Sequence, residues 1–70
     1  MKIIFTKHAE SRLEKRKILK EEVIDAMTYP DKILKKYGLY YFQKRLDRGI
    51  IEVPCEKIGS NIKVITVYWI

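Results

Sequence analysis

Three basic side chains recur at every fourth position near the N-terminus, namely His8, Arg12 and Arg16. At about 100° per residue in an α-helix they span an arc of about 80°, so they share one flank. Lys15 extends that flank on its outer side. An arginine fork can pair two phosphate oxygens, and a histidine can transfer a proton near neutral pH. The spacing favours a phosphate-binding flank. The alternative is that the arginine stems cover the core while their heads cap carbonyls or pair with acids, and that the histidine is a hydrogen-bonded structural residue.

A second group of basic side chains is mixed with aromatic ones between residues 39 and 46. Successive side chains of a strand point to opposite faces, which places Tyr41, Gln43 and Arg45 together. The other face includes Phe42 and makes the better core, so we expect the first three to be exposed. Exposed aromatic side chains beside an arginine can stack on bases while the charge binds phosphate. The alternative is an ordinary solvated sheet face with a tyrosine at an interface.

The chain lacks the residues that other common kinds of site require. The single cysteine, Cys55, excludes an internal disulfide, and one histidine with one cysteine cannot supply the four Cys or His ligands of structural zinc. The three glycines form no phosphate-binding loop, and no serine or cysteine stands in a recognisable nucleophile motif. We therefore expect no metal and no cofactor.

The chain is strongly basic. It has 15 lysines and arginines against 9 aspartates and glutamates, a formal net charge of +6 and a pI near 9.6. Such an excess over a short chain attracts polyanions, so the expected partners are RNA, DNA or an acidic protein. Solubility alone is the simpler alternative.

The length of 70 residues predicts a single domain over residues 1–70, and a hydrophobic content of 47% is enough for a core. A chain this short buries only about 60% of the surface that its unfolded form exposes. Small domains often gain stability by association, so a homodimer is one possible partner state. No apolar run approaches the roughly 20 residues that cross a bilayer, and the apolar part of the N-terminus is too short for a signal peptide. We therefore expect no membrane association and a cytoplasmic location.

Two helices are expected in the first half of the chain. The β-branched and aromatic run Ile3-Ile4-Phe5 predicts a short strand, and the hydroxyl of Thr6 can then cap a helix over residues 7–16. A second helix fits residues 20–28, with acidic side chains in its first turn. Pro30 ends it.

The second half of the chain predicts strands separated by turns, at residues 33–37, 39–46, 50–57 and 62–70. The last of these is apolar at nearly every position, which places it inside the sheet with Val67 and Trp69 buried. Pro54 cannot donate to a ladder, so its strand is either an edge or bulged there. The fold class is therefore α+β, with an N-terminal strand and a pair of helices packed on a mostly antiparallel sheet of four to five strands.

Taken in order, these features resemble the RelE/ParE toxin superfamily, and most closely its small branch of uncharacterised domains with a His-x3-Arg-x3-Arg helix. Besides the three helix residues, the supporting residues are Ile18, Val23, Pro30-Asp31-Lys32 and the ending Val64-Ile65-Thr66-Val67-Tyr68. The resemblance covers nearly the whole chain in element order. It implies a helical pair packed on an antiparallel sheet.

Many members of that superfamily are ribosome-dependent mRNA endonucleases that are neutralised by an antitoxin encoded beside them, and others inhibit gyrase. The resemblance implies a toxin-like protein that acts on RNA or the ribosome, with an acidic antitoxin as its partner. The ribonucleases of the superfamily use basic residues of the sheet and often a tyrosine near the C-terminus. The matching residues here are Lys44, Arg45 and Tyr68.

Cleavage without metal would proceed by attack of a ribose 2′-hydroxyl on the adjacent phosphate. His8 or Tyr68 would handle the proton, while Arg12, Arg45 and Lys44 would hold the phosphate. The expected RNA-binding residues are Arg16, Lys44, Tyr41 and Lys15. The alternative is a non-catalytic RNA- or protein-binding module of the same fold, because binding needs only a continuous basic surface.

Overall fold

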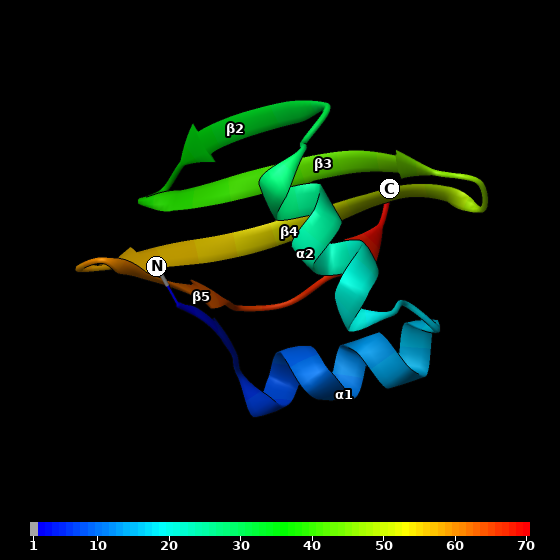
Figure 1. Ribbon diagram of the computed structural model, residues 1–70, viewed down its shortest axis with the longest axis horizontal. Helices are drawn as coiled ribbons and strands as arrows, with labels where there is room; N and C mark the ends of the chain where they lie inside the picture. The colour runs from blue at the N-terminus through cyan, green and yellow to red at the C-terminus, as the bar shows by residue number, and fades with distance from the viewer. Residues whose placement is uncertain (1) are drawn as a thin grey trace.

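The computed structural model describes residues 2–70, in which two helices pack against a mixed sheet (Figure 1). Helix α1 spans Lys7–Arg16 and helix α2 spans Lys20–Thr28, as the sequence predicts. Thr6 caps α1, because its hydroxyl accepts a hydrogen bond from the Ala9 N–H at 2.9 Å. Within residues 2–70 no helix is both long and apolar enough to cross a membrane.

The sheet of residues 2–70 has six strands rather than the expected four to five. They are β1 (Ile3–Phe5), β2 (Lys32–Lys36), β3 (Leu39–Leu46), β4 (Gly49–Ile58), β5 (Asn61–Val64) and β6 (Tyr68–Trp69). The strand order is β1-β5-β4-β3-β2, and β6 also pairs with β4. Strand β1 runs parallel to β5, and the other pairings are antiparallel. The general α+β class is therefore confirmed, and the strand count is corrected.

The expected continuous strand over residues 62–70 is wrong, because the chain leaves the ladder between β5 and β6. Val64 lies opposite Cys55, and Trp69 lies opposite Ile51. Between these two pairs the C-terminal segment advances five residues while β4 advances four. One extra residue is therefore accommodated as a bulge, which reverses the face that each later side chain occupies.

Pro54 explains the break. In each hydrogen-bonded pair of a regular antiparallel ladder, the two facing residues exchange both of their backbone hydrogen bonds. The Ile65 N–H donates to the Pro54 carbonyl at 2.9 Å, but proline has no N–H with which to return a bond. The Ile65 carbonyl accepts instead from the Thr6 hydroxyl, at 3.2 Å. The disruption expected at Pro54 is thus present, but the extra residue lies in the opposite C-terminal segment. The proline's own strand, β4, is continuous and lies inside the sheet, so it is neither an edge strand nor the bulged strand.

The released segment is fastened to the end of α1. The Arg16 guanidinium donates through Nη1 to the Val67 carbonyl at 2.7 Å, and the Trp69 indole N–H donates to the Arg16 carbonyl at 3.0 Å. Val67 is fully buried, as expected, although it lies in no strand. Trp69 is half-buried in β6 rather than buried in a central strand.

The core lies between the helices and one face of the sheet. It is formed by Ala9, Leu13, Ile18, Val23, Ala26, Phe42, Ile51, Val53, Cys55, Ile62, Val64 and Val67. The sheet residues of this set share one face by strand alternation, so we call that face the helix side and the opposite one the open face. Figure 1 shows α2 crossing over β3 and β4, with α1 alongside.

Replacing Arg16 with Met tests the link between α1 and the C-terminal segment. The substitution keeps an aliphatic stem but removes the donor to the part-buried Val67 carbonyl. We expect the free energy of unfolding, measured with urea, to fall by about 1–3 kcal/mol, because a carbonyl is left without its partner. Arg12→Met is the matched control, since it removes the same charge from the same helix flank. A change larger than about 0.5 kcal/mol in the control, equal to that of Arg16→Met, would contradict this role.

Candidate functional site

The open face of the sheet carries a row of polar side chains across four strands. Lys32, Gln43, Glu52 and Tyr68 lie directly opposite one another on β2, β3, β4 and β6. Directly opposed residues of neighbouring strands share a face. These side chains alternate with core residues, so the row faces away from the helices.

Glu52 is the centre of this row. The Gln43 amide donates through Nε2 to one Glu52 carboxylate oxygen at 2.7 Å, and the Tyr68 hydroxyl donates to the other. Tyr41 lies in the next row of the same face, opposite Pro54. We call Tyr41, Gln43, Glu52 and Tyr68 the Glu52 cluster.

Tyr68 keeps its proton at neutral pH. Burial, the hydrogen bond to Glu52 with its negative charge, and the neighbouring Tyr41 together raise the pKa of the Tyr68 hydroxyl to about 12, with burial as the largest cause. A phenol in this state can donate a hydrogen bond or a proton but is a poor base near pH 7. Its proton is already directed at the Glu52 carboxylate.

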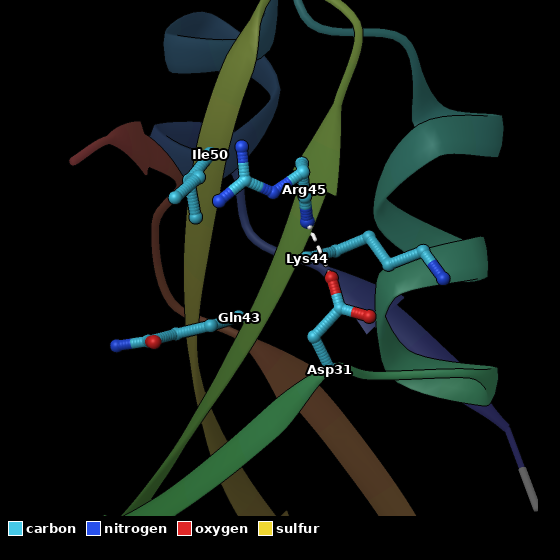
Figure 2. A pocket seen from close by; sticks show the side chains of 5 residues that line it. All are labelled: Asp31, Gln43, Lys44, Arg45 and Ile50. Atoms are coloured by element: carbon cyan, nitrogen blue, oxygen red, sulfur yellow. Dashed lines mark hydrogen bonds between the residues drawn. The ribbon is translucent and has the colours of Figure 1, made fainter.

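Lys44 and Arg45 point to opposite faces of the sheet (Figure 2). The Lys44 ammonium donates to the Tyr29 carbonyl at 2.8 Å and lies 4.0 Å from the Asp25 carboxylate, on the helix side. The Arg45 side chain extends toward Ile50 on the open face (Figure 2). The two cations therefore do not converge on one phosphate.

Asp31 fixes the backbone of β3 at Arg45, because its carboxylate accepts from the Arg45 backbone N–H at 2.7 Å (Figure 2). The Arg45 guanidinium is exposed, and no side-chain hydrogen bond or ion pair holds it among residues 2–70. An open hollow of about 420 Å³ surrounds this point. Its lining residues are Asp31, Gln43, Lys44, Arg45 and Ile50.

The predicted basic flank of α1 lies away from this hollow. Strands β4 and β6 separate α1 from β3, so Arg12 does not join Arg45. Arg16 is committed to the Val67 carbonyl, which is the carbonyl-capping alternative. His8 and Lys15 are exposed, and His8 lies two turns before Arg16, about 12 Å along the helix axis. The structure therefore does not gather the expected catalytic residues into one cleft.

A run of positive charge without any acidic residue lies instead on the hairpin of β2 and β3, residues 32–46. It carries five cations and no acidic residue, between Asp31 and Asp47. The cations are Lys32, Lys35, Lys36, Lys44 and Arg45. Of these, Lys44 alone takes part in an ion pair among residues 2–70. We call residues 32–46 the basic hairpin.

Aromatic rings accompany the cations of the basic hairpin. The Lys36 ammonium lies 5.3 Å from the centre of the Tyr41 ring, and the Lys35 ammonium lies 5.3 Å from that of Tyr40. Tyr37 sits in the turn with 90% of its surface exposed. The hairpin thus offers both positive charge and flat apolar surfaces.

Among residues 2–70, no group of three or more His, Cys, Asp or Glu side chains could hold a metal ion. Cys55 is fully buried, and burial raises the pKa of its thiol to about 12. The thiol is therefore protonated and unreactive near neutral pH.

Residues 5–69 match the model of a family described as a domain of unknown function (DUF4258). The chain belongs to this family. No curated protein and no solved structure matches the chain. The likeness of this DUF4258 domain to RelE/ParE toxins therefore remains a prediction made from its own residues.

Two features of the DUF4258 domain were missed by the sequence analysis. The basic hairpin was visible as a run without acids between Asp31 and Asp47, a pattern that is read from the sequence alone. The hydrogen bond between Glu52 and Tyr68 cannot be read from the sequence, because it depends on the one-residue bulge. In an unbroken ladder Tyr68 would face Ile51 and lie on the helix side.

The pKa of Tyr68 tests the Glu52 cluster. With ring-labelled tyrosine and NMR, we expect the wild-type Tyr68 to titrate near 12. In Glu52→Gln the midpoint should fall toward the ordinary 10, because the charged acceptor is lost while burial remains. The stability that this shift contributes is present below pH 10 and is lost as pH rises through 12. Glu56→Gln is the control, and an equal midpoint in all three proteins would refute the contact.

Proposed function

We propose that the protein binds single-stranded RNA through the basic hairpin and the open face of the sheet. The observation that carries this proposal is the hairpin of residues 32–46, which holds five cations and no acid. Exposed cations without ion pairs can bind phosphates without first losing a protein partner. Lys32, Lys35, Lys36 and Arg45 meet this condition within residues 2–70.

The aromatic rings favour a single strand over a duplex. Bases of a single strand can stack on exposed aromatic side chains, whereas bases of an A-form helix are stacked on one another. Tyr41 lies on the open face, and Tyr37 is exposed at the tip of the hairpin. No helix covers the open face among the described residues, so an extended strand of RNA has room to lie across it.

Toxin-like cleavage of mRNA, with an antitoxin as inhibitor, is the finer proposal that the RelE/ParE resemblance suggests. The geometry supports binding better than cleavage. Tyr68 holds its proton toward Glu52, and Lys44 and Arg45 point to opposite faces. Among residues 2–70, Tyr68 is thus not available as a base, and the two expected cations do not converge on the open face.

The salt dependence of RNA binding tests the proposed surface. For single strands, log K falls with log salt concentration by about 0.7 for each phosphate that is neutralised. The double variant Lys36→Gln with Arg45→Gln should weaken binding to oligouridylate and flatten the slope by about 1.4, if each cation neutralises one phosphate. Fluorescence anisotropy at several salt concentrations measures both quantities.

The matched control is Lys7→Gln with Lys15→Gln, which removes the same net charge from exposed positions of α1. It should keep the wild-type slope. An equal loss in the two double variants would mean that net charge alone attracts RNA. Absence of binding at low salt would end the RNA proposal and favour an acidic protein partner.

Cleavage is tested separately by incubating the protein with mRNA and ribosomes. We expect the bound RNA to be recovered intact and induced expression to leave growth unchanged. Specific cuts that Arg45→Ala reduces by roughly 100-fold would instead support the toxin-like nuclease, since that is the scale for losing one preorganised donor.

A further inference from the structure

The open face of the sheet, which we propose binds phosphates, has the carboxylate of Glu52 at its centre. Glu52 is in no ion pair among residues 2–70, whereas Glu56, four residues along the same strand and on the same face, lies 3.5 Å from the Lys63 ammonium. A carboxylate repels phosphate, so Glu52 does not help to bind the RNA backbone. If Glu52 contacts the ligand, it must therefore contact a group other than the phosphates.

The Glu52 carboxylate is held in one orientation. Gln43 donates to one oxygen and Tyr68 to the other, from the strands on either side of β4. An ionised carboxylate is an acceptor only, and each of its oxygens can accept more than one hydrogen bond. Both oxygens therefore keep acceptor capacity for a ligand with two neighbouring donors. The second amide proton of Gln43 is left as a donor beside them.

Among the four RNA bases, guanine matches this pattern. Its Watson–Crick edge presents the donors N1–H and N2–H next to the acceptor O6. Adenine and cytosine each present one amino donor beside an acceptor nitrogen, and uracil presents one donor between two carbonyl oxygens. A carboxylate facing those edges would meet a lone pair where it needs a donor.

The neighbours of Glu52 supply the remaining contacts of a base-binding site. Tyr41 lies one row away on the same face, and its ring can stack on a base. Lys32 lies in the same row as Glu52, and Arg45 lies one pleat further along β3. Phosphates on either side of a bound nucleotide would thus have cations within the same face.

We infer that the Glu52 cluster is a guanine-selective subsite on the RNA-binding face, where Glu52 accepts from N1–H and N2–H of an unpaired guanine and Gln43 donates to O6. This inference rests on the proposed RNA binding. It adds to that proposal a preference among single strands, which the cations alone cannot provide.

The experiment compares oligouridylates that carry one central guanosine, inosine or adenosine, in low salt, by fluorescence anisotropy. The wild-type protein should bind the guanosine strand about 10-fold more tightly than the adenosine strand, the scale of one good bidentate contact. Inosine keeps N1–H and O6 but lacks the N2 amino group, so it should lose most of this preference. That comparison needs no variant and is independent of how well any variant folds.

Glu52→Gln should reduce the preference for guanosine to less than about 2-fold while binding to plain oligouridylate is kept, because the variant replaces one acceptor by a donor. Glu56→Gln removes the same charge from the same face and should keep the full preference. If no strand binds at low salt, the proposed function itself fails. If strands bind without a preference for guanosine, or if the two variants lose it equally, the proposed function stands and the guanine subsite is refuted.

Discussion

Pro54 has no N–H with which to return the hydrogen bond that it accepts from Ile65, and much of the architecture follows from that missing proton. The carbonyl left free at Ile65 accepts from Thr6, the residue that also caps α1. After a one-residue bulge the chain rejoins β4, and Arg16 holds the released segment through Val67. One local constraint thus determines how the first helix is attached to the sheet.

The same bulge determines which side chains lie on the open face. It turns Tyr68 from the helix side to the open face, where its hydroxyl meets Glu52. Gln43 completes the arrangement from β3. A carboxylate oriented from both sides then lies beside the acid-free basic hairpin. In our proposal, the cations bind phosphate and the carboxylate binds a base edge on the same face.

The sequence was sufficient for the local elements and insufficient for the long-range register. The sequence predicts both helices with their bounds, because the cap at Thr6 and the stop at Pro30 are local signals. Pro54 predicts a disturbed ladder from sequence alone. That the extra residue lies in the opposite segment, and that it turns Tyr68 over, depends on contacts of that segment with the distant Thr6 and Arg16. The α1 flank does not join the expected catalytic residues of the sheet for a related reason. Helix periodicity determines which residues share a flank, but not which part of the molecule that flank faces.

The central claim, that a guanine-bearing RNA strand lies on the open face, is tested most directly by NMR. Isotope-labelled protein would be titrated in low salt with an oligouridylate that carries one guanosine, and amide and side-chain shifts would be mapped. We predict the largest changes in the Gln43 side-chain amide, in Tyr41 and Tyr68, and along the basic hairpin, with small changes on the outer surfaces of α1 and α2. Shifts concentrated on His8, Arg12 and Lys15, with an unchanged open face, would contradict the account.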